Sequence, residues 1–162
     1  MLRRLLAALA LVALGAAAAL ATHLATAKGD TMFAGKRPTY LGVKDGRLPR
    51  PRSTPNCVSS QADRADTVHY IEPIRFKGTA PEAIAAARKA VESMPRTTVI
   101  RREGNYLYAE FRSRLLGFVD DVEFTYDEKA GVLHVRSASR LGRRDYGVNR
   151  ARVEQLRSRI AA

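Results

Sequence analysis

Five stretches of the chain carry either alternating apolar and polar residues or a high content of β-branched and aromatic residues, which predicts about five strands. These stretches are 68–74, 97–102, 105–113, 118–126 and 132–139. Short connections rich in glycine and charged residues join the last four stretches as two hairpins. We therefore expect a mostly antiparallel sheet.

Two further segments show helical spacing of their apolar residues. In the first, GTAPEAIAAARKAVESMP, a capping box of Thr79 and Glu82 marks the start and Pro95 marks the end. The second segment is NRARVEQLRSRI near the C-terminus. The inward stripes are Ile84, Ala87, Val91 and Met94 in the first segment and Val153, Leu156 and Ile160 in the second. The order of elements predicts the α+β class, with both helices packed on one face of the sheet.

The N-terminal segment is predicted to direct export. Arg3 and Arg4 precede an uncharged apolar run from Leu5 to Ala21, and small residues follow it. Residues 1–27 are interpreted as a signal peptide or a membrane anchor. Both alternatives stay open, because the run is about as long as the shortest helix that spans a bilayer. Either one places the remainder outside the cytoplasm, in the periplasm or anchored to the inner membrane.

Residues 28–66 read as an extended arm in which prolines and arginines alternate, and residues 67–162 as the α+β domain. The sequence Lys44-Asp45-Gly46, set between apolar residues, has the composition of a turn. We therefore expect the arm to contact the domain surface.

The charge balance points to an anionic partner. The chain of 162 residues contains 28 Lys and Arg against 16 Asp and Glu, a formal net charge of +12. Because the chain is predicted to be exported, the expected partner is an anionic lipid or another envelope component and not nucleic acid. The oligomeric state stays open.

The strand register predicts where polar residues gather. Setting Phe124 opposite Leu133 matches the apolar faces of the last hairpin and also sets Asp120 opposite Ser137. One helical turn before the inward Val153 is Asn149, which points at the same edge of the core. The predicted cluster comprises Asp120, Ser137, Ser139, Arg140, Asp145, Asn149 and Arg150.

Three interpretations of this cluster stay open: a structural network, an anion site, and a centre of catalysis. The polar groups either satisfy one another, with Arg140 as the partner of the Asp120 carboxylate and Asp145 or Asn149 as a helix cap, or they form an anion site. In an anion site, arginines near the start of the helix would receive a phosphate or carboxylate. These arginines are Arg140, Arg143, Arg144 and Arg150.

The opposite face of the same hairpin is predicted to carry an outward ladder of charges. The register sets Asp121 near Arg136 and Glu123 near His134. On the last helix, the arginines outside the apolar stripe, including Arg152 and Arg157, are expected to be solvated, with Glu154 pairing beside them.

Cys57 is the only cysteine, so no disulfide forms within the chain. In STPNCVSS it is the one candidate nucleophile, and His69, His134 or Asp120 would have to reach it as a base. The secondary candidate residues are Asn56, Cys57, Ser59, Ser60, Asp121 and Arg136. The histidines share no ligand spacing and no nucleotide fingerprint is present, so we expect neither a metal nor a cofactor.

The chain also resembles the domain-of-unknown-function 1499 family over about residues 41–160. The resemblance rests on LGVKDGRL, PNCVSS, GFVDDVEF and VRSASRLGRRDYGVNRARVEQLR, in this order. It implies no established activity. The sequence departs from the family pattern at Arg50, where many relatives carry a cysteine followed by proline.

These observations together predict a cell-envelope protein. We expect its domain to bind or scaffold a polar or anionic envelope component without catalysis. The alternative is a hydrolase or transferase that depends on Cys57.

Overall fold

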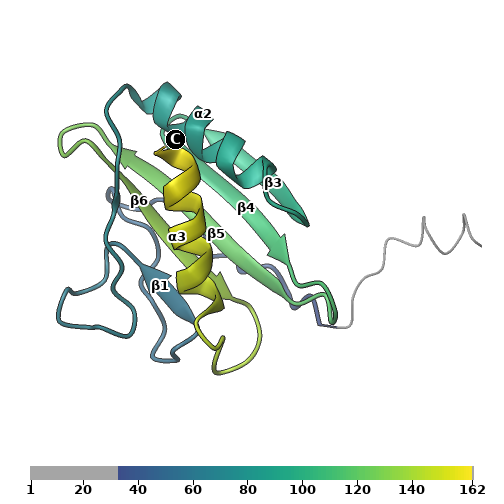
Figure 1. Cartoon of the computed structure of the whole chain (residues 1–162). Helices are drawn as coiled ribbons and strands as arrows, with labels where there is room; N and C mark the ends of the chain where they lie inside the picture. The colour runs from purple at the N-terminus through teal and green to yellow at the C-terminus, as the bar shows by residue number, and fades with distance from the viewer. Residues whose placement is uncertain (1–32, 162) are drawn as a thin grey trace, which may run out of the picture. The chain divides into compact units, whose positions relative to one another are not determined.

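The computed structural model describes residues 33–161, so the predicted signal peptide or anchor lies outside the described residues. The described chain forms one six-stranded sheet with two helices on one face (Figure 1). The strands are β1 Cys57–Ser59, β2 Ile74–Arg75, β3 Thr97–Glu103, β4 Tyr106–Arg112, β5 Val119–Asp127 and β6 Val132–Ser139, and the helices are α2 Ala80–Glu92 and α3 Val148–Ile160. The predicted α+β class is confirmed. Within residues 33–161, no helix is long and apolar enough to cross a membrane.

The sheet is antiparallel and has the order β1-β6-β5-β4-β3, with β2 also paired to β6. β1 comes from the predicted arm. The strand predicted at 68–74 is wrong for most of its length, because only its last residue, Ile74, pairs with β6. The backbone before it turns instead, since the carbonyl oxygen of Asp66 accepts the N–H groups of His69 and Tyr70, and Pro73 has no N–H to donate.

Both helices lie where their apolar stripes predict. At the start of α2, the Glu82 carboxylate accepts the N–H and the hydroxyl of Thr79 at 2.8 and 2.9 Å. α2 packs on β3, β4 and β5, whereas α3 packs on β6 and β1 (Figure 1). The most buried residues between these layers are Ile74, Ala83, Ile84, Ala87, Val91, Leu107, Ala109, Val122, Phe124, Leu133, Val135, Val153 and Leu156. Burying each large apolar side chain contributes about 1.5–3 kcal/mol, so this layer is the main source of stability.

The register of the β5–β6 hairpin differs from the prediction by two residues. Phe124 pairs with Val135, and Asp120 pairs with Ser139. The connection is a four-residue turn at 128–131, because the Asp127 carboxylate accepts the N–H groups of the two residues that follow Glu128. A shift of two residues keeps every side chain on its predicted face but changes its partner.

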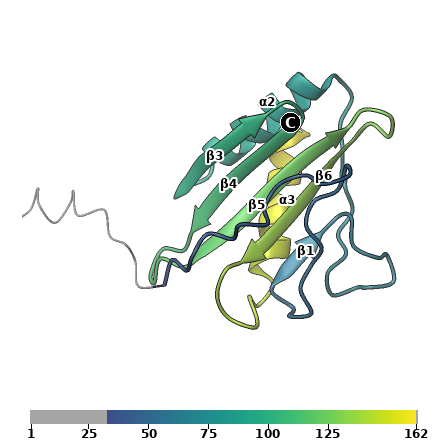
Figure 2. The same ribbon diagram turned by 180° about the vertical axis from the view of Figure 1, so that it is seen from behind.

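The face of the sheet opposite the helices is covered by residues 33–56 of the predicted arm (Figure 2). The predicted turn in the arm is present. Lys44 and Arg47 exchange backbone hydrogen bonds of 2.9 and 3.0 Å, and the two residues between them have φ of 51° and 72°, as in a type I′ turn. Leu48 packs against Tyr106 and Tyr108 on the sheet. The face predicted to be outward is therefore buried.

Candidate functional site

The residues predicted to form one polar cluster are divided among three places. Asp120 and Asp121 are neighbours in β5 and therefore point to opposite faces. Asp120 lies on the helix side, near Ser137, whereas Asp121 lies under the arm and binds Arg140. Arg150 contacts neither group and lines a separate groove beside α3.

The helix-face cluster surrounds the buried side chain of Asn149. Its members are Asn56, Asp120, Ser137, Ser139, Asp145, Asn149 and Arg152. The amide oxygen of Asn149 accepts the hydroxyl of Ser137 at 2.6 Å and a guanidinium N–H of Arg152 at 2.8 Å. Its amide nitrogen faces Asp145 Oδ2, Ser139 Oγ and the carbonyl oxygen of Asn56 at 2.8–3.0 Å. The Asp145 carboxylate also accepts the backbone N–H of Asn149 at 2.8 Å, as a helix-capping side chain does.

Arg152 is the member that the sequence analysis missed. It was predicted to be solvated, yet its side chain is only 11% exposed and lies over the ring of Phe111, 5.0 Å from the centroid. It is also the partner of Asp120, at 2.6 Å, in the place predicted for Arg140. The spacing of Arg152 from Asn149 could have predicted its burial. Residues three apart share a helix face, and Asn149 was predicted to point inward.

The helix-face cluster is closed. Among residues 33–161, the buried side-chain nitrogen and oxygen atoms without a hydrogen-bond partner are Nε of Arg101 and Nε of Arg136, and neither belongs to this cluster. Each polar group therefore satisfies another, which favours the structural interpretation. The cluster joins Asn56, which precedes β1, and strands β5 and β6 to the start of α3.

The arm-face cluster is centred on Arg140. Its guanidinium donates to the Asp121 carboxylate at 2.7–3.1 Å and to the Tyr108 hydroxyl at 3.0 Å, and it also pairs with Glu110. Arg37 of the arm binds the same Glu110 carboxylate at 2.7 Å. Burial by itself raises the pKa of Glu110, but hydrogen bonds from Arg37 and Arg140 outweigh it, so the pKa is lowered. The arm is thus held to the sheet through a shared carboxylate.

A second ion pair under the arm joins Arg136 to Glu123 at 3.1 Å. The two side chains are 2% and 0% exposed. Glu123 also accepts the Tyr106 hydroxyl and the backbone N–H of Gly42, both at 2.8 Å. Burial raises the pKa of Glu123 even though Arg136 counters it. The predicted outward ladder, which paired Asp121 with Arg136, is therefore wrong in both partners and burial.

Cys57 lacks the surroundings of an activated thiol. It is buried, and its sulfur is 3.7 Å from the carbonyl oxygen of Val58. Burial raises the pKa of the thiol, whereas a nucleophilic cysteine needs a lowered one. The ring of His69, a predicted base, is held by Asp66 at 2.7 Å and by the carbonyl oxygen of Thr54 at 3.2 Å. This geometry disfavours the Cys57-dependent enzyme.

The serines after Cys57 have local hydrogen-bonding roles. Ser60 Oγ accepts the N–H of Val135 at 2.9 Å and is 3.1 Å from Nδ1 of His134. Ser59 Oγ accepts the N–H of Gln61 at 3.2 Å. In the described part of the chain, no group of three or more His, Cys, Asp and Glu side chains is placed to hold a metal ion.

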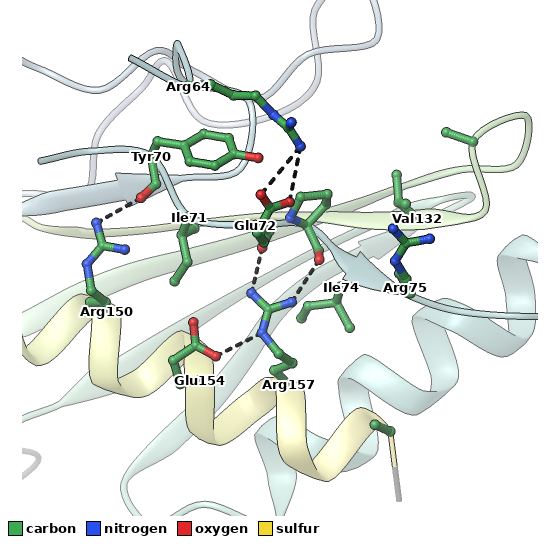
Figure 3. Close-up of a pocket in the computed structure, with 13 residues that line it drawn as sticks. Arg64, Tyr70, Ile71, Glu72, Ile74, Arg75, Val132, Arg150, Glu154 and Arg157 are labelled. Atoms are coloured by element: carbon green, nitrogen blue, oxygen red, sulfur yellow. Dashed lines mark hydrogen bonds and ion pairs between the residues drawn. The ribbon is translucent and has the colours of Figure 1, made fainter. Parts of the chain in front are cut away.

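A groove of about 1040 Å³ lies between α3 and the segment 64–75 (Figure 3). Four arginines line it: Arg64, Arg75, Arg150 and Arg157. Two carboxylates oppose them, those of Glu72 and Glu154, so the lining carries two more positive than negative charges. Apolar side chains, including Pro73 and Val132, line the same groove.

The arginines of the groove differ in how their charge is compensated. Arg150 donates to backbone carbonyl oxygens, of which that of Tyr70 is nearest at 2.8 Å, and pairs with no carboxylate of residues 33–161 (Figure 3). Arg157 binds Glu154 at 2.8 Å, so the predicted ion pair is present, but Arg157 also binds the carbonyl oxygen of Pro73 at 2.7 Å and is only 26% exposed. Arg75 is exposed, and no dashed line joins its guanidinium to another residue drawn in Figure 3.

The fold and these clusters define a small α+β domain with buried arginine–carboxylate pairs on both faces of its sheet. The chain belongs to the family described as protein of unknown function (DUF1499), whose model matches residues 47–160. The predicted resemblance is thus confirmed. The match runs from the turn of the arm to the end of α3 and includes the helix-face cluster and, except for Arg37, the arm-face cluster. A search of curated proteins finds no match.

Proposed function

We propose that this protein is an exported cell-envelope component whose domain binds an anionic partner without catalysing a reaction. The groove beside α3 is the proposed binding site. The observation that carries the proposal is the state of Arg150, whose guanidinium is oriented by carbonyl oxygens and left without a carboxylate partner in the described chain.

An arginine in this state is preorganised for an anion. The carbonyl oxygens restrict the side chain before the ligand binds, so less conformational entropy is lost on binding. Arg75 supplies a second charge on the same groove. A phosphate or carboxylate can accept two parallel N–H groups from one guanidinium, which favours these groups over chloride.

The lining also favours an amphiphilic ligand. Pro73 and Val132 present apolar surface beside the arginines. An anion that carries hydrocarbon next to its charged group can use both kinds of lining. Phosphorylated lipids of the envelope have this chemistry. Export itself is supported by Arg3 and Arg4 before the apolar run Leu5–Ala21.

The test uses dihexanoyl phosphatidic acid, a monomeric short-chain lipid, as the probe. Isothermal titration with the full chain should detect binding, and Arg75→Gln/Arg150→Gln should weaken it about tenfold or more, since a charge-assisted hydrogen bond contributes about 1.5–3 kcal/mol. The control is Arg88→Gln/Arg102→Gln, which removes the same charge from exposed positions outside the groove. Equal weakening in both variants, or no binding to the wild-type chain, would refute the groove as the site.

A further inference from the structure

Large apolar side chains are exposed together at one end of the sheet. Five of the eight exposed large apolar residues in the described chain lie on two loops and the first residue of α3. They are Leu115, Leu116, Leu141, Tyr146 and Val148. Leu115 is 89% exposed and Tyr146 is 94% exposed. A soluble surface seldom carries such side chains in a group unless it binds something.

The two loops, 113–118 and 140–147, are neighbours in space. Asp120 at the start of β5 pairs with Ser139 at the end of β6. The N–H of Arg140 donates to the carbonyl oxygen of Val119 at 3.2 Å. Figures 1 and 2 show both loops at the end of the sheet where β4 and β6 terminate. These exposed apolar residues thus all lie at this end of the sheet, which we call the apolar end.

Basic side chains surround the apolar end. Arg114, Arg143 and Arg144 are exposed and make no ion pair with the described residues. Asp145, which follows Arg143 and Arg144 in the sequence, uses its carboxylate to accept backbone and side-chain N–H groups of Asn149. Apolar tips surrounded by uncompensated arginines match the headgroup region of an anionic bilayer.

The described chain also starts at the apolar end. The ring of Phe33 packs on Phe118 with centroids 5.2 Å apart. In the sequence, residues 22–32 separate Phe33 from the apolar run Leu5–Ala21. Eleven residues reach at most about 40 Å when fully extended. If the apolar run lies in a membrane, these eleven residues limit the distance between Phe33 and the membrane to about 40 Å.

We propose that the apolar end is a docking surface for a bilayer that contains anionic phospholipid. Leu115, Leu116 and Tyr146 enter the headgroup region, and the three arginines bind lipid phosphates. Tyr146 suits this depth, because tyrosine concentrates at membrane interfaces. Its φ of 53° is a left-handed conformation that costs energy for an aromatic residue, and it presents the ring to the outside. The docking surface depends on the export proposed above but not on the groove.

The absence of tryptophan from the sequence allows a direct test. In Leu115→Trp, the indole reports on the apolar end, whereas in Lys129→Trp it reports on the β5–β6 turn at the opposite end of the sheet. Each full-length variant is reconstituted into vesicles of phosphatidylcholine and phosphatidylglycerol with brominated acyl chains. We expect bromine quenching and a blue-shifted emission in Leu115→Trp but not in Lys129→Trp.

The charge requirement is tested in the Leu115→Trp background. Arg143→Gln/Arg144→Gln should lower the docking equilibrium about 25-fold, since each arginine near an anionic surface contributes about fivefold. Arg88→Gln/Arg102→Gln removes the same charge elsewhere and should leave the quenching unchanged. Equal quenching in the two tryptophan variants would overturn the docking surface. Quenching in neither variant would also overturn it, and this is the result expected if a protein covers the apolar end. Equal quenching of Leu115→Trp in vesicles of pure phosphatidylcholine would overturn the requirement for anionic lipid. Because the groove is tested with a soluble monomeric lipid, the two proposals fail separately.

Discussion

The buried ion pair under the arm allows the sharpest prediction about stability. Arg136→Met removes the guanidinium and keeps most of the volume of the side chain, so it leaves the Glu123 carboxylate buried without its cation. Glu123 then retains the Tyr106 hydroxyl and the Gly42 N–H, both at 2.8 Å. The loss should therefore come from an uncompensated charge and not from a cavity.

The expected cost follows from the geometry. Breaking a fully buried ion pair costs about 3–5 kcal/mol. Two hydrogen bonds still hold Glu123, and Nε of Arg136 has no partner in the described chain, so part of the guanidinium is unsatisfied even in the native state. Both facts place Arg136→Met near 3 kcal/mol, the lower end of the range. For an m-value of about 1.5 kcal/mol per molar urea, the unfolding midpoint should fall by about 2 M.

Urea unfolding followed by circular dichroism measures this shift. Glu123→Gln should cost a similar amount of unfolding free energy. Its amide oxygen can still accept the Gly42 N–H and the Tyr106 hydroxyl, but the neutral amide no longer neutralises Arg136. The double variant should cost about 2 kcal/mol less than the sum of the two single variants, the signature of direct coupling. The matched control is the exposed i,i+4 pair of Arg88 and Glu92, at 3.3 Å, where Arg88→Met should cost less than about 0.5 kcal/mol. A loss in Arg136→Met no larger than in Arg88→Met would refute the reasoning.

Three further predictions follow from other buried groups. Arg152→Met should cost about 2–4 kcal/mol in urea unfolding, because Asp120 loses its cation; a loss below about 1 kcal/mol would show that the cluster is not coupled. Cys57 should react with Ellman's reagent at pH 8 about 100-fold more slowly in the folded chain than in urea, since the sulfur is covered and burial raises its pKa, and fast labelling would contradict this. The lowered pKa of Glu110 adds stability that is complete above about pH 4.5 and is lost as the pH falls further, so Glu110→Gln should flatten the acid side of a stability profile measured by urea unfolding.

Local sequence patterns predicted the strands and helices that are determined by interactions between residues close in sequence. The strands β3 to β6 and both helices lie within a few residues of their predicted bounds, because alternation, capping and helical spacing each act over a few residues. The segment 68–74 shows the limit. Its β-branched and aromatic residues favour a strand, but the Asp66 carbonyl oxygen binds the N–H groups of His69 and Tyr70 and turns the backbone.

The candidate site was harder to predict because its partners depend on tertiary structure. Alternation correctly predicted the faces of Asp120 and Ser137. The register of the hairpin differs by two residues from the predicted one, however, so each has a different cross-strand partner. The burial of Glu123 could not be predicted from its strand alone, since the cover comes from Gly42 in an arm with no periodic pattern. Alternation thus predicted the faces of these polar residues but not their pairings.

The folded structure also changes what the net charge of +12 means. Arg136, Arg140 and Arg152 are each neutralised by carboxylates inside the domain, so they contribute little to the field that a ligand meets. The uncompensated charge of the described chain instead includes Arg150 in the groove and the arginines of the apolar end. The groove and the apolar end are therefore two separate places that retain positive charge for an anion. Added salt should screen the exposed arginines of the apolar end strongly and the buried pairs weakly, so salt that releases the domain from a bilayer should leave its fold intact.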